Sequence, residues 1–213
     1  KFDPATYSDA IAFARIGEGS LGGKARGLAF MNSMPVKYCQ YAKYENVRVT
    51  IPRTVVVATD YFDAFIRNNG LEYVLTTEMT DEEILSEFVS STLPYKLREA
   101  LKAYVRTVSG PLAVRSSSKL EDSHYQPFAG IYSTYMIPYT EGNEDRQLRL
   151  LQKAIKSVYA STYFAASKAY VQSSQNHRQN LPLRCRSHNS PDSCQNSLQA
   201  FPEVPCYQVL IFY

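Results

Sequence analysis

The sequence predicts an α+β fold, because segments with the apolar period of a helix occur together with short β-branched runs typical of strands. The chain has 213 residues, of which 45% are hydrophobic and 13% aromatic. This composition can supply the core of one globular domain or of two small ones. The formal charge of +3 is too close to balance to indicate a nucleic-acid partner.

The first expected elements lie on either side of a glycine-rich stretch, GEGSLGGKARG, at residues 17–27. Residues 7–16, which precede it, have a pattern closer to a helix than to a strand. Helical spacing follows the glycines in KARGLAFMNSM, and Pro35 lies just beyond as a stop. We therefore expect a glycine loop that opens onto a helix.

The next segment, VRVTIPRTVVVATD, is expected to be extended, with a buried strand over Thr54–Val57. A short helix should follow over residues 61–69. Either Thr59 or Asp60 can cap its beginning, and Gly70 closes its end.

Two helices are expected in the middle of the chain. Thr80 and Glu83 form a capping box before EILSEFVS, and TLPYKLREALKAYVRTV is amphipathic with its proline in the first turn. A short buried strand, PLAVRS, comes next, and its last residue but one is Arg115. The polar loop SSSKLEDSHYQPFAG then leads into IYSTYMIP, which has strand composition.

The last part of the chain changes character. Helical period continues from residue 144 to about residue 172, which predicts the longest helix. Residues 173–213 contain no glycine and no lysine, and only CYQVLIFY at their end has a strand-like pattern, with no tight hairpin partner upstream. We expect a domain over residues 1–172 and a divergent tail over 173–213, either disordered or aberrant through a frame change or truncation.

The glycine-rich stretch admits three interpretations. Gly17, Gly19 and Gly22 fit the dinucleotide pattern G-x-G-x-x-G, but the helix-like pattern before them disfavours it. The P-loop pattern fails at Glu18 and Ala25. What is left is Lys24 at a glycine turn that begins a helix, which suits a phosphate; the alternative is a solvated surface turn.

Arg115 is the second candidate for binding a phosphate, because it ends a buried strand beside a loop rich in hydroxyl groups. The alternative is a structural ion pair with Glu121 or Asp122. We predict no metal site in the tail, because the spacing of its cysteines and histidine follows no standard zinc pattern: Cys185, His188, Cys194 and Cys206.

Three motifs in register carry a family resemblance. GGKARGLAFM, IPRTVVVATDYFDAFI and AVRSSSKLEDSHYQPFAGIYSTY resemble, in this order, the N-terminal nucleotide-binding domain of the phosphoenolpyruvate synthase and pyruvate, phosphate dikinase family. The match covers roughly residues 11–172. The resemblance implies an ATP-grasp-like fold, in which ATP lies between two α+β subdomains, and which is incomplete at the C-terminal end of this chain.

The resemblance also implies site residues. Lys24 and Arg115 would hold the phosphates of ATP, and Arg115 would also act in catalysis. Gly130 would lie in a loop over the nucleotide, and Thr134 would add a polar contact. Glu121 and Asp122 match the family's acidic pair and are expected to order the arginine loop. His124 is not expected to be the phosphorylated histidine, which belongs to a separate domain in the family.

The implied activity is the ATP-dependent phosphorylation of a histidine carrier and then of pyruvate, and the implied partners are ATP and, through downstream domains, pyruvate or phosphoenolpyruvate. The cofactors are ATP and Mg²⁺, whose ligands are not recognisable in this chain, so we expect the chain alone to be catalytically incomplete. The alternatives are a related dikinase acting on an antibiotic or a glucan, and a non-catalytic nucleotide-binding or regulatory module. With no apolar run of about 18 residues and no secretory leader, a cytoplasmic protein is expected.

Overall fold

A computed structural model describes residues 1–8, 11–33, 51–117, 133–169 and 207–211. Its five strands form one sheet in the spatial order β1 (Phe13–Ile16), β2 (Arg53–Val57), β5 (Tyr207–Ile211), β3 (Leu112–Ser116) and β4 (Tyr135–Ile137). The first four strands are parallel, and β4 runs antiparallel to β3. The predicted mixture of helices and strands is confirmed.

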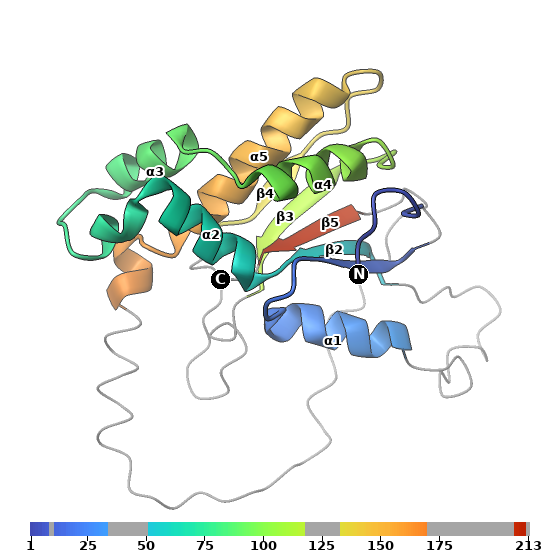
Figure 1. The fold of residues 1–213 in the computed structure, drawn as a ribbon, viewed down its shortest axis with the longest axis horizontal. Helices are drawn as coiled ribbons and strands as arrows, with labels where there is room; N and C mark the ends of the chain where they lie inside the picture. The colour runs from blue at the N-terminus through green and yellow to red at the C-terminus, as the bar shows by residue number, and fades with distance from the viewer. Residues whose placement is uncertain (9–10, 34–50, 118–132, 170–206, 212–213) are drawn as a thin grey trace, which may run out of the picture.

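Helices cover both faces of this sheet (Figure 1). On one face lies α1 (Gly22–Ser33), and on the other lie α2 (Thr59–Asn69), η3 (Leu71–Leu75), α3 (Asp81–Ser90), α4 (Tyr95–Val105) and α5 (Glu144–Ser161). Parallel sheets need this double cover because their strands are apolar on both sides. Among the described residues, no helix is both long enough and apolar enough to cross a bilayer.

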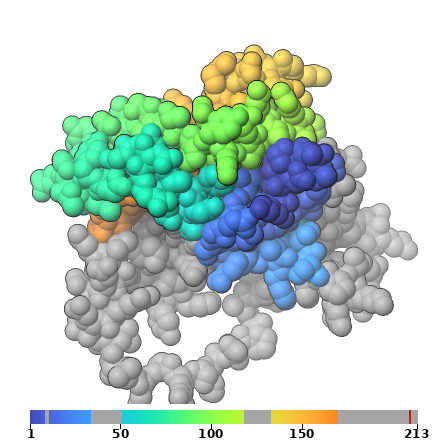
Figure 2. All heavy atoms as spheres, in the orientation of Figure 1, coloured from blue at the N-terminus to red at the C-terminus, as the bar shows by residue number. Residues whose placement is uncertain are grey.

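The alternation of side chains along β2 divides the core in two. Val55 and Val57 belong to the larger cluster, which they share with α2–α5. Val56 points to the opposite face, where it packs with Ala25 of α1. The N-terminal residues also join the larger cluster: the ring of Phe2 lies 6.5 Å from that of Tyr104 in α4, and Figure 2 shows this part of the chain beside α4.

The α5 helix holds the helical layer together. Its Tyr159 is fully buried, with ring centroids 4.9 Å from Phe62 and 5.4 Å from Phe65 in α2. The ammonium of Lys156 donates to the carbonyls of Val89 and Ser91 at the end of α3. These contacts satisfy carbonyls that the helix itself leaves unpaired.

The strand β5 is the centre of the sheet. Residues 207–211 pair in parallel with β2 on one side and with β3 on the other. The expected strand in CYQVLIFY is therefore confirmed. It needs no tight hairpin, because parallel neighbours are reached through long connections.

Two predicted elements differ from the structure at the N-terminal end. Residues 13–16 form a strand, although residues 7–16 were expected to be helical; Ala14 and Ile16 are buried in alternation, which suits the pleat of β1. The helix α2 begins at Thr59 and has Ala58 as its N-cap without a side-chain bond. Thr59 and Asp60 are thus not caps of α2, because their oxygens bind an earlier part of the chain.

The boundaries of the other helices and strands agree more closely with those predicted from the sequence. Gly70 closes α2 in the left-handed conformation, with φ +62°, and the capping box of Thr80 and Glu83 is formed at α3. The strands β2 and β3 lie where they were expected. The long helix ends at Ser161 instead of about residue 172, and a short helical segment resumes at Ala165, whose N–H donates to the Asp81 carboxylate.

We predict that Val209→Ala destabilises the protein by about 2 kcal/mol, because it removes two methyl groups from a fully buried position in the central strand. Met136→Ala is the control, since this β4 side chain is 67% exposed and should change stability little. Urea unfolding of both variants measures the difference. Equal stability of the two variants would show that β5 does not occupy the centre of the sheet.

Candidate functional site

The candidate site lies at the edge of the sheet where the parallel strands end. The loop of residues 17–21 leaves β1 at this edge, α2 begins there after β2, and Ser117 follows β3. In open sheets with parallel strands, ligands bind outside these carboxyl ends. The fold therefore brings the glycine-rich stretch and the strand of Arg115 to one edge.

The glycine loop is attached to the first turn of α2. The Asp60 carboxylate accepts the N–H of Glu18 at 3.0 Å and that of Gly19 at 3.2 Å, one with each oxygen. The Thr59 hydroxyl accepts the N–H of Ser20 at 3.1 Å, and the Thr59 N–H donates to the Ser20 carbonyl at 3.3 Å. Three successive backbone amides of the loop, those of residues 18–20, thus donate to side chains in the first turn of α2.

Gly17 and Gly19 are explained by this attachment. A Cβ at Gly17 would lie 2.4 Å from the Asp60 carboxylate, and the residue has φ +97°, which favours glycine. A Cβ at Gly19 would lie 2.3 Å from the Thr59 hydroxyl. Although β1 does supply the preceding strand that the dinucleotide pattern requires, the amides of Glu18 and Gly19 are bound to Asp60. These glycines bring the chain close to α2.

The first turn of α1 is attached to the end of β3. The fully buried Ser117 hydroxyl accepts the N–H of Ala25 at 3.0 Å and donates to the Leu21 carbonyl at 3.0 Å. The Lys24 ammonium lies 3.4 Å from the Ser116 carbonyl, to which it donates. The ammonium and the N-terminus of α1 therefore lie at the end of β3, which is 92 residues later in the sequence.

Arg115 lies on the face of the sheet that α1 covers. Its backbone is in register with Leu210 of β5, which is in register with Val56 of β2, so Arg115 and Val56 share a face. Two strand spacings separate them, or about 10 Å. The side chain of Arg115 is exposed. Lys24 and Arg115 thus approach the same edge from α1 and from β3.

Thr134 lies directly before β4 and is exposed. The antiparallel register of β3 and β4 pairs Val114 with Tyr135, and continuing it by one residue places Thr134 opposite Arg115. Three of the four predicted binding residues are therefore at one place. Other residues named from the sequence lie outside the described part of the chain: Gly130, Pro35, Glu121, Asp122, His124, Cys185, His188, Cys194 and Cys206.

The chemistry of this edge suits an anion. Two cationic side chains and the N-terminus of α1, where the helix dipole is positive, come together there. The Ser116 hydroxyl is buried and has no hydrogen-bond partner among the described residues. In register, however, Ser116 shares the face of Val57, which α2–α5 cover, so its hydroxyl lies on the opposite face of the sheet from Arg115.

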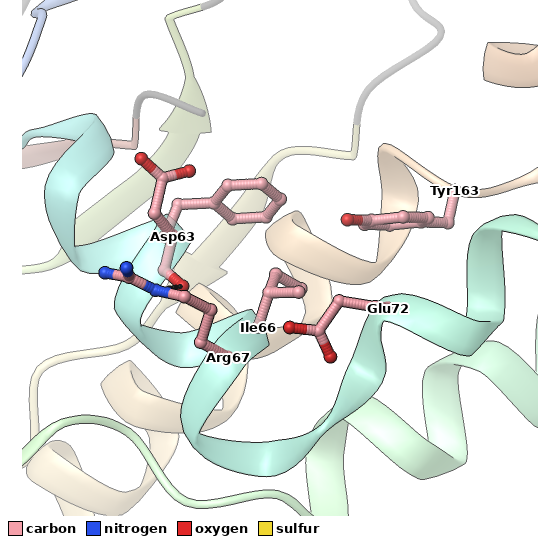
Figure 3. Close-up of a pocket in the computed structure, with 6 residues that line it drawn as sticks. Asp63, Ile66, Arg67, Glu72 and Tyr163 are labelled. Atoms are coloured by element: carbon pink, nitrogen blue, oxygen red, sulfur yellow. Dashed lines mark hydrogen bonds between the residues drawn. The ribbon is translucent and has the colours of Figure 1, made fainter.

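A pocket of about 360 Å³ lies elsewhere, between α2, η3 and the turn after α5 (Figure 3). It is lined by two carboxylates, one guanidinium and two aromatic rings: Asp63, Glu72, Arg67, Phe62 and Tyr163, with Ile66. Burial, with the charges of Glu72 and Asp63, raises the pKa of Tyr163 to about 12. The excess of carboxylates makes this pocket a poor site for a polyphosphate.

Sequence reasoning missed two residues that build the site. Asp60 was interpreted as a possible helix cap, and Ser117 was named only as part of the hydroxyl-rich loop beside Arg115. Both instead bind the backbone around α1. Both groups were visible in the sequence, but the Asp60 carboxylate binds an amide 41 residues away and the Ser117 hydroxyl binds one 92 residues away.

The family model described as pyruvate phosphate dikinase, AMP/ATP-binding domain, matches residues 18–184. This range includes residues 18–21 of the glycine loop, α1 and the strands β2, β3 and β4. No curated protein and no solved structure matches the chain.

We predict that Ser117→Ala destabilises the protein by about 2 kcal/mol, because the Ala25 N–H and the Leu21 carbonyl lose their partner. Ser116→Ala is a matched control: the adjacent hydroxyl is equally buried but has no partner among the described residues, so its loss should change stability by less than about 0.5 kcal/mol. Denaturant unfolding compares the two. A larger loss for Ser116→Ala would contradict the assignment of Ser117.

Proposed function

Because this chain belongs to the pyruvate phosphate dikinase AMP/ATP-binding domain family, we propose that the carboxyl edge of its sheet binds the phosphates of ATP. The observation that carries the proposal is the position of Lys24. This residue lies in the first turn of α1, and its ammonium is 3.4 Å from the carbonyl of Ser116 at the end of β3. Within the family's ATP-binding domain, a cation held at a helix N-terminus is suited to a phosphate.

Each predicted residue has a role in this proposal. The Lys24 ammonium and the Arg115 guanidinium neutralise phosphate oxygens, and Arg115 can grip two oxygens at once. Thr134, opposite Arg115 in the continued register, offers a hydroxyl to the same group. Gly130, outside the described residues, is assigned by resemblance to the loop over the nucleotide. The fold is proposed to be the phosphate-binding part of an ATP-grasp domain.

The proposed reaction is a phosphoryl transfer like that of phosphoenolpyruvate synthase and pyruvate, phosphate dikinase. ATP, when bound, supplies the phosphoryl group, which passes to a histidine carrier and then to pyruvate. Such transfers depend mainly on positioning and on charge neutralisation, so the cations at the sheet edge stabilise the negative charge of the transferred group. Among the described residues, no cluster of three or more acidic, histidine or cysteine side chains is placed to hold a metal, and we assign none to Mg²⁺.

The affinity expected from these contacts is modest. A charge-assisted hydrogen bond contributes about 1.5–3 kcal/mol, so Lys24 and Arg115 together contribute about 3–6 kcal/mol. This corresponds to dissociation constants from about millimolar to tens of micromolar. We propose that this chain by itself binds ATP weakly.

We predict that Lys24→Ala weakens ATP binding by about 10- to 150-fold, because one charge-assisted contact is lost. A titration followed by the chemical shifts of backbone amides measures weak affinities directly. Arg26→Ala removes an equal charge from the exposed side of the same helix and is expected to weaken binding less than about threefold.

Arg115→Ala is the second variant and should lose affinity to a similar extent as Lys24→Ala. Shift changes on ATP addition should be centred on residues 22–25 and 115–117. Equal affinity of Lys24→Ala and Arg26→Ala, or shift changes confined to the pocket of Figure 3, would refute the proposed site.

A further inference from the structure

We propose that Asp60 is a positioning residue of the nucleotide site. Its carboxylate holds the glycine loop so that the first turn of α1 and the Lys24 ammonium face the end of β3. Asp60 needs no contact with the nucleotide for this role, which rests on the proposed function of Lys24.

The geometry supports a specific need for a carboxylate. The two oxygens of Asp60 each accept one backbone amide, from Glu18 and from Gly19. A side-chain amide has only one acceptor oxygen, and its NH₂ group would face the second N–H donor. Asp60→Asn therefore keeps the size of the side chain and breaks one half of the attachment.

The connection between this attachment and Lys24 is short. The amides of residues 18–20 are all bound by Thr59 and Asp60, and α1 begins only two residues later, at Gly22. The contact of Gly17 and Gly19 with α2 leaves no space for the loop to move toward it. The position of the loop thus determines where the first turn of α1 begins.

Asp60 also determines which amides are available to an anion. Successive backbone N–H groups in a loop form a concave site that attracts phosphate. Those of Glu18 and Gly19 are already bound to a carboxylate. A phosphate is thereby directed to the first turn of α1 and to Lys24, away from the loop before it.

The test is a double-mutant cycle on ATP affinity with Asp60→Asn, Lys24→Ala and the double variant. Asp63→Asn is the matched control, because this exposed carboxylate lies one turn later on α2 and lines the separate pocket of Figure 3. We expect Asp60→Asn to weaken ATP binding about tenfold and to speed hydrogen exchange at the Glu18 and Gly19 amides. Asp63→Asn should do neither. In the Lys24→Ala background, the effect of Asp60→Asn on affinity should fall below twofold, because coupled residues are not additive.

Asp60→Glu, which keeps both acceptor oxygens, should recover part of the affinity and of the amide protection. If Asp60→Asn is unfolded at the assay temperature, Thr59→Ala, which removes only the bond to the Ser20 amide, takes its place in the cycle. Equal losses with and without Lys24, or an unchanged affinity despite faster exchange at Glu18 and Gly19, would overturn the positioning role alone. A wild-type protein that shows no ATP binding would overturn the proposed function and the role of Asp60 together.

Discussion

The parallel pairing of β5 with both β2 and β3 is the constraint on which the rest of the structure depends. Within the sheet, β2 and β3 are both hydrogen-bonded to this strand, in one continuous register. That register sets the separation between the start of α2 and the end of β3, and the glycine loop and α1 are each attached to one of these points. The carboxyl edge is therefore assembled by a strand that contributes none of the predicted binding side chains.

The elements that the sequence predicted well are those whose causes are local. β-branched residues make Thr54–Val57 a strand in isolation, and Thr80 and Glu83 complete their capping box within a single turn. Residues 13–16 were misassigned because a short apolar run fits either period, and only pairing with β2 resolves it. The end of α5 was also missed, because the restart at Ala165 is stabilised by Asp81, which lies 84 residues earlier.

In the candidate site, too, features with a local cause were predicted and features that depend on distant contacts were not. Residue patterns suggested Lys24 and Arg115 as candidates for binding phosphate, and the family resemblance added Thr134. The fold places all three near one edge, and their roles stay predictions. The most conspicuous pattern, the spacing of Gly17 and Gly19, has a different cause from the one it suggested. Those glycines accommodate Asp60 and Thr59 in the first turn of α2, and a contact between segments so far apart in sequence has no local pattern.

The attachment of α1 has a mechanical consequence. The buried residues of this helix, Gly22 and Ala25, both lie in its first turn, whereas Phe30 and Met31 near its other end are exposed. The first turn is also where the Ser117 hydroxyl binds the backbone around the start of α1, so this end of the helix is held in place. Lys24 lies within this first turn. The bonds from this turn to Ser116 and Ser117 thus place the ammonium through the buried end of the helix, and the exposed outer residues Phe30 and Met31 contribute to none of them.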